Sequence, residues 1–84
     1  MVIGGIDTTN LLSANVHPYT ATQDCVVLYA TRNSTVVYID GQVVMNYQAD
    51  SETTYSYTFY LKKGQTFDCA PSNNWTLKVY GIKY

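Results

Sequence analysis

The dipeptide Asp40-Gly41 stands between two runs of β-branched and aromatic residues, and it is the strongest local signal in the chain. A type I′ turn of two residues requires positive φ at both central positions, which glycine accepts and aspartate tolerates. The segment from Ser34 to Tyr47 is therefore predicted to form a β-hairpin. In the register that this turn sets, the facing residues are Ile39 with Gln42, Tyr38 with Val43, Val37 with Val44, Val36 with Met45, and Ser34 with Tyr47.

In that register both faces of the hairpin carry large apolar side chains. A hairpin with one solvent-exposed face alternates apolar and polar residues along each strand, and this hairpin does not. We therefore expect both faces to be covered, the second by another subunit. The first face holds Tyr38, Val43, Val36, Met45 and Tyr47, and the second holds Ile39, Val37 and Val44 together with Gln42, Thr35 and Asn46.

The size and composition of the chain favour an assembled β protein. With 84 residues it is one domain, and a chain this short buries only roughly 60–65% of its unfolded surface. Charged residues make up 13%, tyrosines number nine and the net charge is −1. Such a composition excludes a basic nucleic-acid footprint and suits an oligomer or a recognition surface. The sequence has no apolar run long enough to span a membrane, so we expect no membrane insertion and see no signal peptide.

The remaining strands are predicted from residue alternation. Within residues 24–31, residues 25–30 form a near-continuous apolar run, which predicts a buried strand. Residues 54–61, 66–70 and 75–83 alternate inward and outward positions, and the expected inward residues are Tyr55, Tyr57, Phe59, Leu61, Phe67, Cys69, Trp75, Leu77 and Val79. Gly64 is the expected positive-φ residue of the turn at 62–65. Residues 1–19 are predicted to be a leader with little regular structure, in which Asp7 to Asn10 cap one helical turn and Leu11 and Leu12 anchor the segment. Residues 20–84 are predicted to form an all-β head domain of about six strands, a small antiparallel β-sandwich or jelly-roll-like barrel.

The chain carries no pattern typical of catalysis, so we expect no enzyme, no catalytic residue, no cofactor and no metal. His17 has no partner at ligand spacing, and Asp50 and Glu52 are interpreted as solvated loop residues rather than calcium ligands. Cys25 and Cys69 are either one disulfide or two buried thiols, of which the second is favoured.

Two sets of residues are candidates for binding. Trp75 with Asn73 and Asn74 would offer a sugar an aromatic face and hydrogen-bonding groups, although Trp75 is more readily interpreted as filling the core or an interface. Apolar positions on the strands are the candidates for a subunit interface, and these are Tyr38, Val43, Met45, Tyr80 and Ile82.

From Asn10 onward the chain resembles the small all-β head domains that end bacteriophage tail- or head-fibre proteins. The resemblance is carried by five segments: Asn10-Leu11-Leu12-Ser13, residues 19–27, 37–43, 59–65 and 77–83. The shared feature is the order of the elements, which is a strand, an Asp-Gly turn, a second strand, a Lys-Lys-Gly turn and a closing strand. Such fibres usually carry a virion-attachment segment and a shaft before the head, and neither is in this sequence, so we expect either an excised head domain or a small stand-alone virion protein. No binding residue is transferred from the family.

The resemblance implies a homotrimer in the virion, assembled in the host cytoplasm, that recognises a bacterial surface saccharide or protein. One alternative is a monomeric carbohydrate-binding β-sandwich of a secreted, extracellular bacterial protein. A second alternative is a structural virion decoration without a ligand. Mass in solution separates the first two hypotheses.

Overall fold

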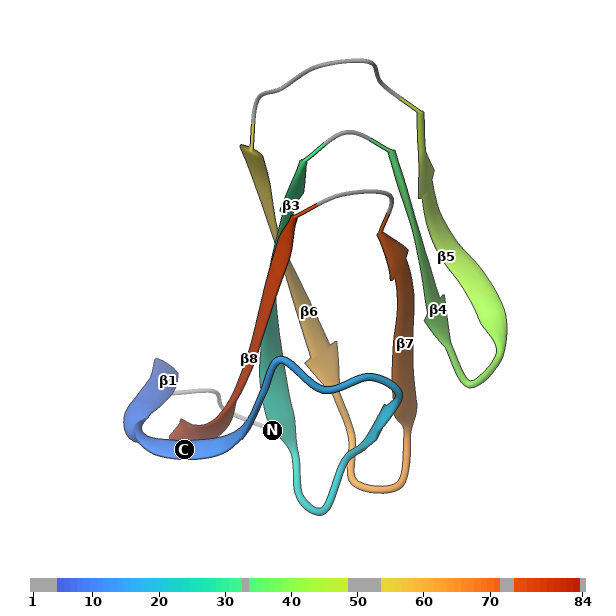
Figure 1. The fold of residues 1–84 in the computed structure, drawn as a ribbon. Helices are drawn as coiled ribbons and strands as arrows, with labels where there is room; N and C mark the ends of the chain where they lie inside the picture. Colours follow the sequence, from blue (N-terminus) through green and yellow to red (C-terminus); the bar gives the residue numbers. More distant parts are fainter. Residues whose placement is uncertain (1–4, 33, 49–53, 72–73, 84) are drawn as a thin grey trace.

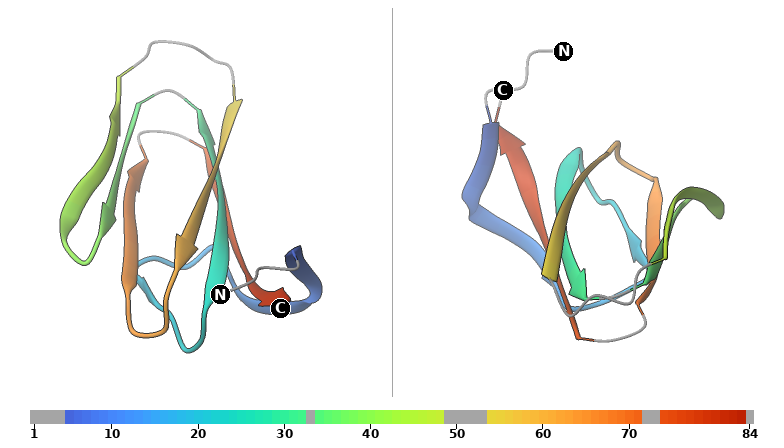
Figure 2. Two further views of the ribbon diagram at one scale, coloured as in Figure 1. Left: turned by 180° about the vertical axis from the view of Figure 1, so that it is seen from behind. Right: turned by 90° about the horizontal axis from the view of Figure 1, so that it is seen from above.

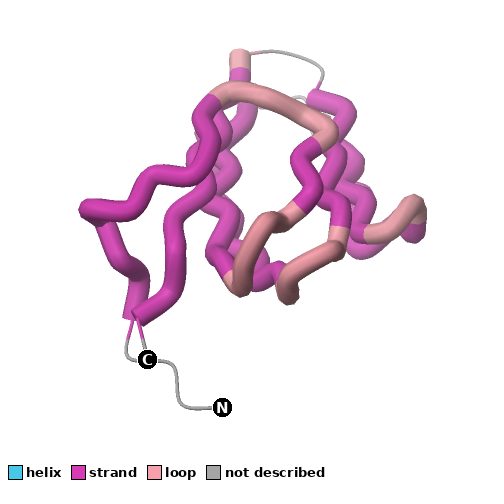
Figure 3. Tube along the Cα trace, turned by 90° about the horizontal axis from the view of Figure 1, so that it is seen from below, coloured by secondary structure: helices cyan, strands magenta, loops and turns pink. Residues whose placement is uncertain are grey.

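A computed structural model describes residues 5–32, 34–48, 54–71 and 74–83, and within them the chain forms strands and no helix (Figure 3). The described residues form eight strands rather than the six expected, because residues 5–14 and 19–20 contribute two more. The strands are β1 (Gly5–Ala14), β2 (Tyr19–Thr20), β3 (Cys25–Arg32), β4 (Thr35–Ile39), β5 (Gln42–Tyr47), β6 (Thr54–Leu61), β7 (Thr66–Pro71) and β8 (Trp75–Lys83).

The strands pair as nested antiparallel partners around the β4–β5 turn. Strand β4 pairs with β5, β3 with β6, β2 with β7 and β1 with β8. Two lateral pairings, β3 with β8 and β4 with β7, join these hairpins into sheets of order β1-β8-β3-β6 and β2-β7-β4-β5. This is the strand order of a jelly roll, and Figure 1 shows the two sheets facing each other. The predicted all-β sandwich is confirmed.

The core lies between the sheets and is built from every second residue of the strands β3, β4, β6, β7 and β8. Tyr29 of β3 and Phe67 of β7 are its largest fully buried side chains. The Phe67 ring lies 6.0 Å from the ring of Tyr29 and 5.5 Å from that of Phe59, measured between centroids. The Tyr29 hydroxyl is 2.7 Å from the Thr35 hydroxyl, so one buried hydrogen bond links the two sheets. The inward positions predicted for β7 and β8 are confirmed by the burial of Phe67, Cys69, Leu77 and Val79.

The central hairpin has the predicted turn but a different register beyond it. Asp40 and Gly41 have φ of 52° and 78°, as a type I′ turn requires. Tyr38 faces Val43 as expected, but Val37 then faces Met45, because Val44 is an extra residue that bulges out of β5. The expected pairs beyond Tyr38 are therefore wrong by one residue.

The bulge also corrects the predicted faces of the hairpin. A shift of one residue moves every later side chain to the opposite face. Met45 and Tyr47 now lie on the inner side with Val37 and Thr35, and Met45 packs against the core. Val43 and Val44 remain 57% and 50% exposed.

The expectation of little regular structure before Tyr19 is wrong, because Gly5–Ala14 form β1, an edge strand. The Asp7 carboxylate does accept a hydrogen bond from the backbone N–H of Thr9. This contact, however, stabilises an irregularity in the β1–β8 register and not a helical turn. Leu12 packs against the core as expected, whereas Leu11 is 53% exposed. Figure 2 shows β1 and the end of β8 running together away from the body of the sandwich.

The turn that follows β6 agrees with the prediction. Gly64 has a φ of 92°, and the N–H of Gln65 donates to the carbonyl oxygen of Lys62 at 3.0 Å. The side-chain oxygen of Gln65 accepts from the N–H of Lys62 in return. The chain thereby passes from β6 in one sheet to β7 in the other.

Candidate functional site

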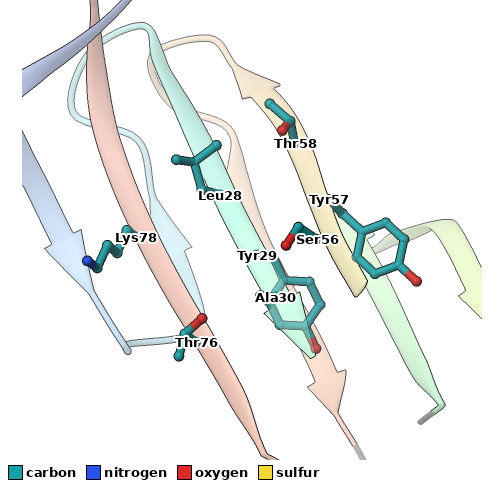
Figure 4. A pocket seen from close by; sticks show the side chains of 8 residues that line it. All are labelled: Leu28, Tyr29, Ala30, Ser56, Tyr57, Thr58, Thr76 and Lys78. Atoms are coloured by element: carbon teal, nitrogen blue, oxygen red, sulfur yellow. The ribbon is translucent and has the colours of Figure 1, made fainter. Parts of the chain in front are cut away.

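A trough of about 290 Å³ lies on the outer face of the β1-β8-β3-β6 sheet, above the central strand β3. Leu28 and Ala30 form its floor. Cross-strand pairing sets Thr58 and Lys78 on either side of Leu28, and Ser56 and Thr76 on either side of Ala30. Figure 4 shows these side chains on one side of the sheet, while the rings of Tyr29 and Tyr57 point to the other.

The trough exists because small side chains occupy neighbouring positions on three adjacent strands. One row holds Ser56, Ala30 and Thr76, none of which reaches far above the sheet. Four residues along β3 from Ala30, the corresponding row holds Tyr60, Val26 and Tyr80. Val26 is completely buried although it points outward, and we attribute this burial to the flanking rings of Tyr60 and Tyr80. The two large tyrosine side chains stand higher above the sheet than the small residues around Ala30, so they close the end of the trough next to Val26.

The polar groups of the trough have no partners in the described protein. The hydroxyl groups of Ser56, Thr58 and Thr76 and the ammonium group of Lys78 make no hydrogen bond or ion pair with another described residue. No acidic residue is among the described residues that line the trough. It therefore combines an apolar floor, hydroxyl-bearing walls and a cation.

A smaller hollow of about 150 Å³ continues the trough past Ala30 and Thr76. Arg32, Thr54, Asn74 and Trp75 line the rest of it. Two of the three predicted ligand-binding residues thus reach this surface, while Asn73 lies outside the described residues. The indole of Trp75 also packs against the core, as the structural interpretation predicted.

Sequence reasoning missed a histidine–carboxylate pair that joins the loop before β2 to strand β7. His17 Nδ1 lies 2.8 Å from Asp68 Oδ1, and the His17 ring meets the Trp75 ring edge-on at 5.0 Å. His17 and Asp68 are far apart in the sequence, so no local sequence pattern predicts that they pair. Among the described residues, no hydroxyl or thiol that could serve as a nucleophile hydrogen-bonds to His17. The described residues also contain no group of three or more His, Cys, Asp and Glu side chains that could hold a metal ion. The pair fixes the loop before β2 against β7 and β8.

The predicted interface residues do not form one patch. Tyr38 and Val43 face each other on the outer side of the β2-β7-β4-β5 sheet. Tyr80 and Ile82 belong to β8 in the other sheet and point outward there. Met45 points inward and packs on the core. Only the first pair belongs to an exposed apolar surface of the second sheet, which it shares with Val36 and Ala70.

Both cysteines are buried free thiols, which agrees with the interpretation favoured from the sequence. Burial, with a smaller contribution from the charge of Asp24, raises the pKa of the Cys25 thiol to about 11. Burial also raises the pKa of the Cys69 thiol to about 11, with a smaller contribution from Asp68. Neither thiol has the lowered pKa of a reactive cysteine.

The buried thiols predict a loss of stability in alkaline solution. Both thiols ionise near pH 9 in the unfolded chain but near pH 11 in the folded one, so the unfolded state loses protons first. The free energy of unfolding should therefore fall as the pH rises above about 9, and the fall should be complete near pH 11. Urea unfolding at a series of pH values from 7 to 11 measures this fall. The matched control is the double variant Cys25→Ala, Cys69→Ala, and an equal fall in that variant would contradict the assignment.

Comparisons of the chain with protein-family models, with curated proteins and with solved structures gave no significant match. The class of protein that the geometry defines is a small jelly-roll β-sandwich with one hollowed outer face and one apolar outer face. No helix in the described residues is long and apolar enough to cross a membrane.

Proposed function

We propose that the protein is a recognition module of the kind found at the head of phage fibres, assembled as a homotrimer in the virion and binding a bacterial surface receptor without catalysis. The observation that carries this proposal is the presence of large apolar side chains exposed on a small sandwich of low charge. Exposed apolar area that a chain cannot cover itself is typical of an interaction surface. The resemblance of residues 10–84 to fibre heads supports the same function.

The outer face of the β2-β7-β4-β5 sheet is the better candidate for assembly. Tyr38 lies opposite Val43 there, and Val36 lies opposite Ala70. The only acidic group in these described rows, Asp68, is already paired with His17. Three copies that turn this face towards a common axis would bury it.

The other outer face then remains available to a receptor. It carries the trough, whose hydroxyl and ammonium groups are unpaired within the described residues. A recognition site typically combines apolar surface with a few polar groups that fix orientation. Receptor binding and assembly would thus use opposite sides of the sandwich.

The test of assembly is the substitution Val43→Lys. The wild-type protein is expected to sediment at three times its chain mass of 9.4 kDa. The variant should sediment as a monomer, because a charge buried at the interface without a partner costs several kcal/mol, on the order of 3–5. Val43 is 57% exposed in the single chain, so the variant should fold.

Thr76→Lys is the matched control, since it places the same charge on an exposed strand position of the opposite face. It should remain trimeric. Attachment of the fluorescently labelled trimer to a panel of bacterial strains tests recognition in parallel. A monomeric wild type that still attaches to cells would favour the carbohydrate-binding alternative, and a trimer that attaches to none would favour the structural decoration.

A further inference from the structure

We infer that the trough binds an anionic saccharide, with sugar rings on the Leu28 and Ala30 floor and the acidic group beside Lys78. This inference deepens the proposed function and rests on it. Nothing in the sequence pattern singles out these residues, because they come from three strands that only the fold brings together.

The walls of the trough match the hydroxyl groups of a sugar. Ser56 and Thr58 on β6 face Thr76 on β8 across the floor, and each hydroxyl can donate one hydrogen bond and accept others. Because these hydroxyls are unpaired within the described residues, a ligand would break no internal hydrogen bond on entering. The floor offers apolar surface for the C–H groups of a sugar ring.

The charge of the trough selects an acidic ligand. Lys78 lines the larger hollow and Arg32 lines its continuation, while no acidic residue lines either among the described residues. The protein as a whole has a net charge of −1, so Lys78 in a trough without acidic lining among the described residues is a local departure from the composition. A carboxylate or a phosphate would meet the ammonium group of Lys78 in a charge-assisted hydrogen bond.

The length of the trough suits more than one sugar unit. From Leu28 to Arg32 the strand β3 advances four residues, which is roughly 13 Å at about 3.3 Å per residue. Tyr60 and Tyr80 limit the trough beyond Leu28. A short oligosaccharide therefore fits along β3, parallel to the strand.

The experiment titrates the full chain with three pairs of probes that differ in charge. The pairs are trigalacturonic acid with galactotriose, sialyllactose with lactose, and glucose 6-phosphate with glucose, so carboxylate and phosphate are tested separately. Binding is followed by the amide chemical shifts of Ala30, Ser56 and Thr76. At least one acidic probe is expected to bind, and its neutral counterpart should bind about tenfold more weakly or not at all.

Two variants and a control locate the site. Lys78→Gln should weaken binding of the acidic probe by about tenfold, because it removes the charge-assisted hydrogen bond. Ser56→Tyr should block the trough without removing a charge. Lys63→Gln removes the same charge from the exposed turn after β6 and should leave binding unchanged.

The outcomes separate the ligand class from the proposed function. Equal binding of neutral and acidic probes, or binding that Lys78→Gln leaves unchanged, would overturn the inference. So would a trimer that attaches to bacterial cells but binds none of the probes, and the proposed function would then stand without it. Attachment to cells that Ser56→Tyr abolishes and Lys63→Gln preserves would support both.

Discussion

Replacing Phe67 by alanine is expected to lower the free energy of unfolding by about 3–5 kcal/mol. Phe67 is completely buried, and its ring packs against those of Tyr29 and Phe59 between the two sheets. Truncation removes the apolar contacts and leaves a cavity that the surrounding strands cannot close without losing register. Because domains are stable by only about 5–15 kcal/mol, this loss is a large fraction of the total free energy of unfolding.

Urea unfolding followed by circular dichroism and by the fluorescence of Trp75 measures this loss. Phe67→Leu is the matched control, since it keeps a large apolar side chain at the same position and should lose clearly less. A Phe67→Ala variant as stable as the wild type would show that the two sheets do not pack around this residue.

The second large effect is expected from the hydrogen bond between Tyr29 and Thr35. Both hydroxyls are buried and lie 2.7 Å apart. Burial raises the pKa of the Tyr29 hydroxyl to about 12, and the contact with Thr35 opposes that rise only in part. Tyr29→Phe leaves the Thr35 hydroxyl buried without this partner, and should cost about 1–3 kcal/mol of unfolding free energy.

A double-mutant cycle isolates the contribution of this contact. Thr35→Val keeps the shape of the side chain and removes its hydroxyl, so it should cost a similar amount alone. The variant that carries both substitutions should be less destabilised than the sum of the two, by about 0.5–3 kcal/mol. Strict additivity would mean that the two hydroxyls do not interact across the sheets.

The two outer faces of the sandwich differ in polarity, and the proposed assembly and the proposed recognition would each use one of them. Val43 and its neighbours present apolar surface with one paired carboxylate, whereas the trough presents hydroxyls and a cation over a small floor. The first face carries few polar groups, namely the Tyr38 hydroxyl, the Asn46 amide and the paired Asp68 carboxylate, whereas the hydroxyl groups and the ammonium group of the trough have no partner among the described residues. Substitutions on the face that carries Val43 should therefore change the mass of the proposed assembly without changing its affinity for a ligand. Substitutions in the trough should change the ligand affinity and leave the mass of the assembly unchanged.

The sequence by itself determined the parts of the structure that depend on neighbours along the chain. Asp40-Gly41 requires the positive φ values of a tight turn, and the alternation in residues 54–61 and 75–83 assigns an inner and an outer face to each strand. Gly64 is found where a turn needs it. Backbone strain and a period of two residues are local properties, so a single sequence is enough to predict them.

The tertiary structure decided which strands are neighbours and therefore which residues meet. Gly5–Ala14 has no clear alternation and becomes a strand only because β8, more than sixty residues away, pairs with it. The bulge at Val44 moves Met45 from the predicted interface into the core. The trough arises because the β3–β6 and β3–β8 registers align Ala30 with Ser56 and Thr76. Register between distant strands is set by the fit of the whole core, so pairings of this kind follow from the fold and from no single segment.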